Sequence, residues 1–190
     1  MPHSACPWWI GYLLLSPFRS IGQDPRRILE PWVRPGMTVV DVGCAMGYFT
    51  LPLARLIGPT GRVVAVDLQA RMVRALERRA RRAGLSQMIE TRRCGTDSLG
   101  LADLAGCVDF ALVFAVAHEV PDVGKLMAEL AALLAAEGRV LLAEPSGHVS
   151  AEEFAASIAA ARSAGLTVAA QPTIARSRAA VLVATGRAVR

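Results

Sequence analysis

A loop of small residues directly after an apolar stretch carries the clearest chemical signal in this sequence. Residues 37–42 are predicted to form a strand that delivers Asp41 to the segment GCAMG at 43–47. Small residues in such a turn let the backbone approach a ligand closely. A second predicted strand ends at Asp67, whose carboxylate is placed to accept hydrogen bonds from ribose hydroxyls. Together these features predict a cofactor that contains a nucleoside.

The spacing of the loop argues against a dinucleotide. Dinucleotide-binding loops use G-x-G-x-x-G, and the third glycine allows the helix to pack closely on the strand. Gly43 and Ala45 can stand for the first two glycines, but Tyr48 occupies the third position. A nicotinamide-dependent oxidoreductase or a non-catalytic nucleotide-binding module therefore remains the alternative rather than the favoured reading.

The spacing D-x-G-x-x-x-G from Asp41 to Gly47, followed by Asp67, resembles class I S-adenosylmethionine-dependent methyltransferases. The segment PDVGKLMAELAALLAAEGRVLLAEP is similar to the ubiquinone, menaquinone and arsenite methyltransferases of the type 11 group. The chain departs from their pattern at Ala136 and Glu137, where a proline and a glycine are usual. The matching residues are Leu126, Glu129, Leu134, Gly138 and Glu144.

The resemblance implies S-adenosylmethionine as cofactor and assigns its contacts residue by residue. The methionine moiety would lie along the loop, the ribose at Asp67, and the adenine between Leu68 and an acidic residue. Asp67 has a helix cap as its alternative role, and Asp97 a turn or cap. The implied cofactor residues are Asp41, Gly43, Cys44, Ala45, Gly47, Asp67, Leu68, Asp97, Phe114 and Ala115.

Polar residues after the fourth and fifth predicted strands are candidates for catalysis and acceptor binding. Open α/β sheets bind ligands at the carboxyl edge of their strands. His118 and Glu119 are the catalytic candidates there, needed as a base only if the acceptor must lose a proton. Glu144 and His148 lie on the same edge and are predicted to bind the acceptor. Packing or backbone contacts are the alternative roles.

The first 24 residues are predicted to be an extension over the acceptor side of a methyltransferase domain spanning 25–190. Trp8, Trp9 and Tyr12 lie in this extension and lack a regular apolar pattern, and Phe18 follows them. They are predicted to wall an apolar or aromatic acceptor. Packing on the sheet edge, a dimer contact and a peripheral membrane contact are the alternatives.

Alternating predicted elements give the fold class. Helices are expected at 25–30, 47–57, 69–83, 123–136 and 152–164, and strands at 37–42, 62–67, 89–93, 109–115, 139–143, 167–173 and 179–185. This order predicts an α/β, doubly wound, mostly parallel sheet. The resemblance implies a Rossmann-like sheet of seven strands whose C-terminal strand is antiparallel.

Composition narrows the setting. The 190 residues fit a single domain, and no apolar stretch reaches the roughly 18 to 20 residues that span a bilayer. Without a signal peptide pattern, a cytoplasmic location is expected. Cysteine and histidine spacing predicts no metal site. The arginines between 71 and 82 are predicted to form the solvated face of a helix. The N-P-P-Y-type element of nucleic-acid methyltransferases does not follow the fourth predicted strand. The expected partner is therefore a small-molecule acceptor rather than nucleic acid.

Overall fold

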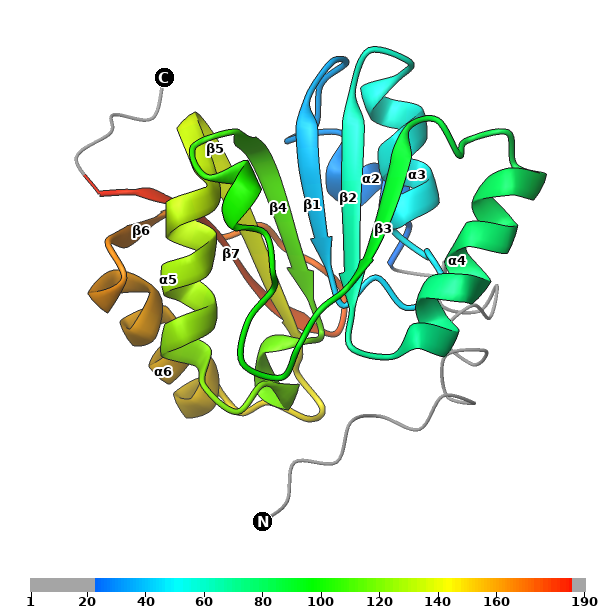
Figure 1. Cartoon of the computed structure of the whole chain (residues 1–190). Helices are drawn as coiled ribbons and strands as arrows, with labels where there is room; N and C mark the ends of the chain where they lie inside the picture. The colour runs from blue at the N-terminus through cyan, green and yellow to red at the C-terminus, as the bar shows by residue number, and fades with distance from the viewer. Residues whose placement is uncertain (1–22, 186–190) are drawn as a thin grey trace. The chain divides into compact units, whose positions relative to one another are not determined.

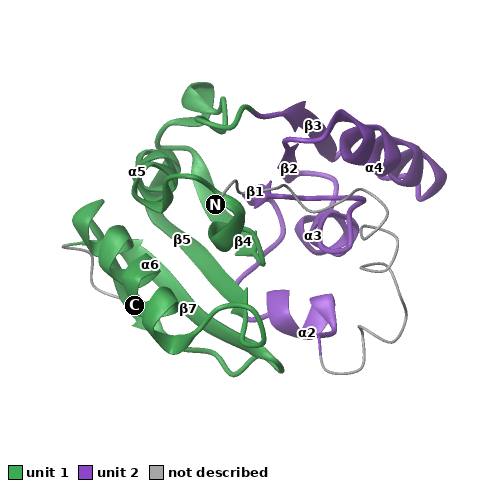
Figure 2. Ribbon diagram, turned by 90° about the horizontal axis from the view of Figure 1, so that it is seen from below, with its two compact units in different colours: residues 1–3, 95–190 green, residues 4–94 purple. Residues whose placement is uncertain are grey.

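The computed structural model describes residues 23–185 (Figure 1). These residues fall into two compact units that meet at the boundary between Cys94 and Gly95 in the sequence (Figure 2). The predicted extension, with Trp8, Trp9 and Tyr12, lies outside the described residues. Each unit is built from strands followed by helices, as the alternating pattern predicts.

The unit before Gly95 is a three-stranded parallel sheet with helices packed on it. The strand order is β3-β2-β1, and Asp41 pairs with Ala65 in the register of β1 and β2. Helix α3 packs on β1 and β2, and α4 packs on β2 and β3. The elements are α2 (Pro25–Leu29), β1 (Thr38–Val42), α3 (Thr50–Ile57), β2 (Arg62–Asp67), α4 (Ala70–Arg82) and β3 (Ile89–Arg93).

The unit from Gly95 onward carries four strands in the order β4-β5-β7-β6. Strands β4 and β5 are parallel, whereas β7 is antiparallel to both of its neighbours. Helices α5 and α6 lie side by side against this sheet. The elements are η2 (Ala102–Leu104), β4 (Val108–Phe114), η3 (Ala117–Glu119), α5 (Val123–Leu133), β5 (Leu134–Pro145), α6 (Ala151–Ser163), β6 (Leu166–Ala170) and β7 (Ser177–Ala184).

The predicted fold class is confirmed: seven mostly parallel strands end in an antiparallel hairpin, with β7 inserted beside β5. The apolar runs predicted as strands form the core, because strands covered on both faces need apolar residues at successive positions. Val39, Val40, Val63 and Val64 are all fully buried.

Local side-chain caps begin α5 and α6, the two α-helices of the unit from Gly95 onward. The Asp122 carboxylate accepts a hydrogen bond from the backbone N–H of Lys125 over 2.9 Å at the start of α5. Ser150 and Glu153 form a reciprocal capping box at the start of α6, with bonds of 3.1 Å and 2.7 Å. Such caps satisfy N–H groups that lack a partner in the first helical turn.

Several predicted boundaries were wrong, among them those of two helices and of the strands predicted at 139–143 and 167–173, which are found at Leu134–Pro145 and Leu166–Ala170. The helix predicted from Gly47 begins only at Thr50, because Gly47 has a φ of +86° and completes the preceding loop. The helix predicted to end at Ala136 ends at Leu133, and strand β5 begins at once. A bulge then separates the pairing of Leu134 from that of Arg139 on β4.

Candidate functional site

The predicted cofactor loop, residues 43–47, folds back onto the end of strand β2. Gly43, Ala45 and Gly47 have left-handed φ values of 68°, 46° and 86°, which reverse the chain repeatedly within five residues. The backbone N–H groups of Gly43 and Cys44 both donate to the carbonyl oxygen of Val66, over 2.9 Å and 3.0 Å. The loop therefore keeps a fixed position relative to the strand that delivers Asp67.

Helix α4 also contacts the cofactor loop. A Cβ atom on Gly47 would lie 2.5 Å from Cδ1 of Leu76, so the absence of a side chain allows this close approach. Met46 is buried against Met72, and the Arg79 guanidinium donates to the Met46 carbonyl oxygen. Sequence reasoning missed Arg79, which it placed among the solvated arginines.

Asp41 is buried beneath the loop, with 3% of its surface exposed. Its carboxylate accepts a hydrogen bond of 2.5 Å from the Thr50 hydroxyl, at the first residue of α3. Burial raises the pKa of Asp41 to about 7, although the Thr50 hydrogen bond acts in the opposite direction. The same burial, together with the nearby carboxylates, raises the pKa of the Cys44 thiol. Asp41 thus adds negative charge under the loop when it ionises.

Asp67 is the link between the strand and the loop. One carboxylate oxygen accepts from the backbone N–H of Ala45 over 3.0 Å, and the other accepts from that of Gln69 over 2.8 Å. Burial raises the pKa of Asp67, and both hydrogen bonds counteract this. A carboxylate offers about four lone-pair positions. Two therefore remain for a ligand, while Leu68, half-buried, follows directly in the chain.

Asp97 lies on an exposed loop of the unit from Gly95 onward, and a residue of helix α5 binds that loop. The Glu129 carboxylate accepts hydrogen bonds from the Leu99 backbone N–H over 2.7 Å and from the Ser98 hydroxyl over 3.2 Å. Glu129 belongs to the sequence segment that resembles methyltransferases, but its contact with this loop was not predicted. The match of Glu129 to the methyltransferase pattern was the sequence signal that could have pointed to this residue.

Glu144 and His118 form a pair at the carboxyl ends of β5 and β4. Glu144 is fully buried, and one of its oxygens accepts from the backbone N–H groups of Val116 and Ala117 over 3.1 Å and 2.8 Å. Its other oxygen contacts Nδ1 of His118. The hydrogen bond to Glu144 raises the pKa of His118, and the nearby Glu119 acts in the same direction.

Both carboxylate oxygens of Glu144 contact groups of the protein, and its role in acceptor binding stays a prediction. The His118 side chain is 30% exposed, whereas that of Glu144 is 0% exposed. Glu119 and His148 are exposed, on η3 and on the turn after β5. Phe114 is buried at the end of β4, and Ala115 follows it with a φ of 58°.

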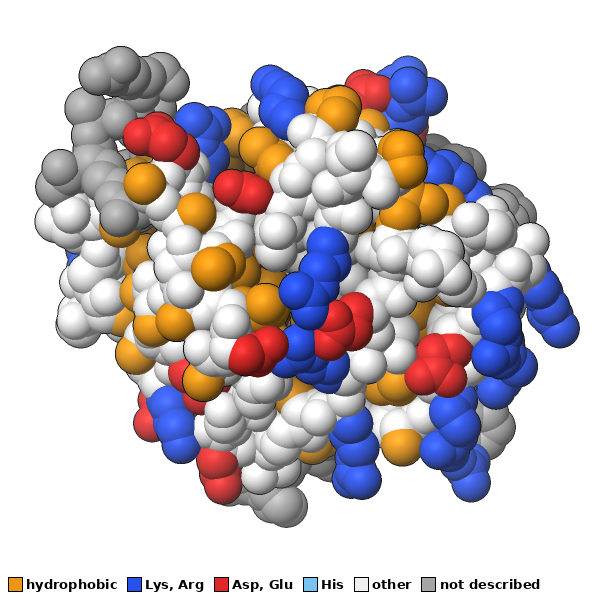
Figure 3. All heavy atoms as spheres, turned by 45° about the horizontal axis from the view of Figure 1, so that its top comes forward, with side chains coloured by type: hydrophobic (Ala, Val, Ile, Leu, Met, Phe, Trp, Pro, Cys, Tyr) orange, Lys and Arg blue, Asp and Glu red, His pale blue; other side chains and the backbone are white. Residues whose placement is uncertain are grey.

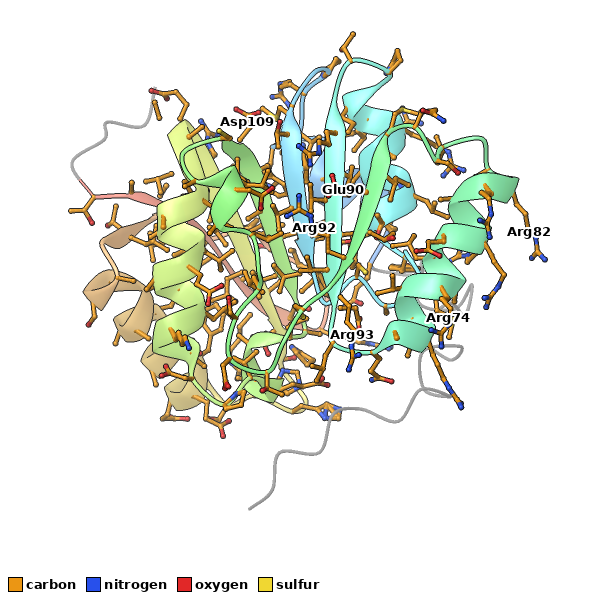
Figure 4. The ribbon with its side chains drawn as sticks, viewed as in Figure 1. Arg74, Arg82, Glu90, Arg92, Arg93 and Asp109 are labelled. Carbon is orange, nitrogen blue, oxygen red and sulfur yellow. The ribbon has the colours of Figure 1, made fainter. Side chains whose placement is uncertain are left out.

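The exposed face of helix α4 carries a band of arginines. Figure 3 shows Lys and Arg side chains gathered on the side where α4 lies in Figure 1, and in Figure 4 Arg74 and Arg82 extend from the helix. On the neighbouring strand β3, Glu90 pairs with Arg92 over 2.6 Å. The exposed arginines of α4 are Arg71, Arg74, Arg78, Arg81 and Arg82.

Within residues 23–185, no three His, Cys, Asp or Glu side chains come together in a group that could hold a metal ion. Over the same range, no helix is both long enough and apolar enough to cross a membrane.

Comparison with known proteins gives consistent results. A family model described as a methyltransferase domain matches residues 34–177. Nocamycin O-methyltransferase of Saccharothrix syringae is 33% identical over 138 residues, which are 73% of this chain and 48% of that protein. The ribosomal protein L11 methyltransferase of Pelotomaculum thermopropionicum is 35% identical over 142 residues, 75% of this chain and 42% of that protein. The chain thus spans about half the length of these curated relatives.

A solved structure extends the likeness over nearly the whole chain. A SAM dependent methyltransferase from Aquifex aeolicus has a TM-score of 0.82 at 22% identity, covering 94% of this chain and 100% of that one. At this level of identity the likeness shows the fold.

Proposed function

The chain belongs to the methyltransferase domain family, and from this premise we propose that it transfers a methyl group from S-adenosylmethionine to a small acceptor. Relatives named for nocamycin and for ribosomal protein L11 differ widely in their acceptors, so the acceptor must be inferred from this chain's own residues. An apolar or aromatic acceptor, contacted by Trp8, Trp9 and Tyr12, is part of the proposal.

The polar groups of the unit before Gly95 fit S-adenosylmethionine. The ligand has no phosphate, and Tyr48 stands where a dinucleotide loop needs its third glycine. The Tyr48 hydroxyl instead donates to the Gln23 carbonyl oxygen over 3.0 Å. The ligand is a cation, and Asp41 lies buried beneath the loop.

The observation that carries the proposal is the Asp67 carboxylate, which is fixed to the loop at Ala45 and retains lone pairs for the ribose diol. Residues 43–47 would hold the methionine moiety along their backbone, with Leu68 packing on the adenine face. Asp97 is proposed as the acceptor for the adenine amino group.

Bound S-adenosylmethionine supplies a methyl group that its sulfonium already activates. The protein then needs chiefly to bind and orient the reactants, and holding two reacting groups in position can lower a barrier by roughly 7 to 11 kcal/mol. Asp67 and the loop would orient the cofactor. His118 would take up a proton if the acceptor must release one.

Calorimetry of the full chain with S-adenosylmethionine, S-adenosylhomocysteine and NAD in parallel tests this function. We expect both sulfur nucleosides to bind and NAD not to bind. Binding of NAD alone would favour the oxidoreductase alternative. Binding of none of the three would refute the assigned cofactor.

A further inference from the structure

The chain after strand β4 turns sharply, so that two successive backbone N–H groups face one carboxylate. Ala115 adopts a φ of 58°, while its own N–H donates to the Ala143 carbonyl oxygen over 2.7 Å. A left-handed conformation is unfavourable for an alanine, because its Cβ crowds the backbone. The turn brings the N–H groups of Val116 and Ala117 onto Glu144.

The Glu144 carboxylate is therefore held by backbone groups independently of His118. A buried carboxylate is costly unless hydrogen bonds compensate its charge. Here the two backbone N–H groups bind Oε1, which leaves Oε2 directed at the imidazole. The third donor is Nδ1 of His118, on the first turn after the strand.

This geometry decides which imidazole nitrogen carries the proton. A carboxylate oxygen accepts hydrogen bonds, so Nδ1 must be the donor. In a neutral imidazole the other nitrogen, Nε2, then has a lone pair. Because the His118 side chain is partly exposed and that of Glu144 is not, Nε2 is the end of the pair that an acceptor can reach.

We propose that Glu144 is a positioning residue that fixes His118 in the tautomer whose Nε2 accepts a proton, and that the methyl acceptor accordingly carries a hydroxyl group. The proposal rests on the proposed methyl transfer. A neutral amine has a lone pair for attack before it loses a proton, whereas a hydroxyl becomes a strong nucleophile only as its proton leaves.

The acceptor oxygen gives its proton to Nε2 of His118 and forms a bond to the methyl carbon. The electron pair of the broken carbon–sulfur bond remains on sulfur, so the products are a methyl ether, S-adenosylhomocysteine and a protonated His118. The imidazolium then returns its proton to water.

The carboxylates around His118 belong to three elements. Glu144 is the penultimate residue of β5, Glu119 is the last residue of η3, and Glu153 lies in the first turn of α6. Each of them raises the pKa of His118, with the Glu144 hydrogen bond as the largest cause, while burial lowers it. The protonated imidazole that the reaction forms is thereby stabilised.

Nitrogen-15 NMR of histidine-labelled protein tests the positioning role without any acceptor or cofactor. The chain has 3 histidines, and His118→Gln assigns the signal. In the unaltered protein we expect neutral His118 to carry its proton on Nδ1. In Glu144→Gln the titration midpoint of His118 should fall by on the order of one pH unit, and in Glu119→Gln by less.

A proton on Nε2 in the unaltered protein would overturn the positioning role, and this result requires no variant. An unchanged midpoint in a folded Glu144→Gln protein would overturn it as well. Failure of this buried substitution to fold leaves the measurement on the unaltered chain decisive.

Transfer of a labelled methyl group to catechol, aniline and toluene tests the acceptor class. We expect methylation of catechol, reduced roughly 10²-fold or more in kcat by His118→Gln, with KM changed little. Methylation confined to aniline, or turnover of catechol that His118→Gln does not change, would overturn the hydroxyl assignment. So would failure to methylate catechol in a protein that binds S-adenosylhomocysteine. Loss of cofactor binding itself would instead refute the proposed function.

Discussion

The carboxylate of Asp67 and the backbone N–H of Ala45 are joined by a hydrogen bond of 3.0 Å across 22 positions of sequence. The bond ties the last residue of β2 to the middle of the cofactor loop. The position of the proposed ribose acceptor and the conformation of the loop are therefore set by one interaction, which Gln69 reinforces through the second carboxylate oxygen.

Replacing Asp67 by alanine should weaken S-adenosylhomocysteine binding at least tenfold. Hydrogen bonds to a charged acceptor contribute on the order of 1.5 to 3 kcal/mol each, and the variant loses those to the ribose diol. Calorimetry gives the affinity, and circular dichroism checks the fold. Asp67→Asn keeps one acceptor oxygen and should bind with intermediate affinity. If a folded Asp67→Ala protein bound as tightly as the original, Asp67 would serve only the loop and the helix start.

The sequence was sufficient for the order of elements and for several of their boundaries. Strand β3 was predicted at 89–93 and found at Ile89–Arg93, and the terminal antiparallel hairpin is confirmed. The end of α5 depends on a contact distant in sequence. A Cβ on Gly138 would lie 2.5 Å from the Val108 carbonyl oxygen, so the backbone returns to β4 earlier than local helix propensity indicates.

The site was predictable by position but not by side-chain direction. The spacing from Asp41 to Gly47 located the loop, yet the partner of Asp41 proved to be Thr50. Residues 140–143 of β5 are all buried, so no alternation of polar and apolar residues could show which way Glu144 points. Its pairing with His118 depends on the turn at Ala115, which has no glycine to reveal it.

The unfolding free energy should carry a pH dependence from Asp41. Its pKa is about 7 in the folded chain against a reference of 3.8, so the unfolded state releases this proton first as the pH rises. The folded state binds more protons between about pH 4 and pH 7, and stability therefore falls across that window and levels off above it. The full effect is up to roughly 4 kcal/mol.

Asp41→Asn removes this titration while keeping an acceptor for the Thr50 hydroxyl. Urea denaturation of both proteins at pH 5 and pH 8 should show the variant gaining stability relative to the original at pH 8. Other titrating groups cancel in the difference. A stability difference independent of pH would contradict the raised pKa.

Two glycine substitutions separate backbone strain from steric clash. Gly47→Ala places a methyl group 2.5 Å from Leu76 at a φ of +86°, whereas Gly84→Ala has a φ of +69° with nothing within 4 Å. Both should lose about 1 to 2 kcal/mol through the left-handed conformation. Gly47→Ala should lose about 1 to 3 kcal/mol more from overpacking. Equal losses in urea denaturation would mean that Leu76 moves aside without cost.

Arg79 should matter for the cofactor loop although its neighbour Arg78 should not. Arg79 is half-buried and donates to the Met46 carbonyl oxygen, and burial lowers its pKa, whereas Arg78 is exposed on the same helix. Removing the guanidinium leaves that carbonyl without its donor, at a cost of about 1 to 3 kcal/mol.

Arg79→Ala should therefore speed hydrogen exchange of the amides at 43–47 and weaken S-adenosylhomocysteine binding severalfold. Arg78→Ala removes the same charge and the same side chain from the same helix, so it should change neither quantity. Equal effects in the two variants would assign the loss to net charge. Faster exchange in Arg79→Ala alone would establish that the loop owes its conformation partly to the guanidinium that donates to the Met46 carbonyl oxygen.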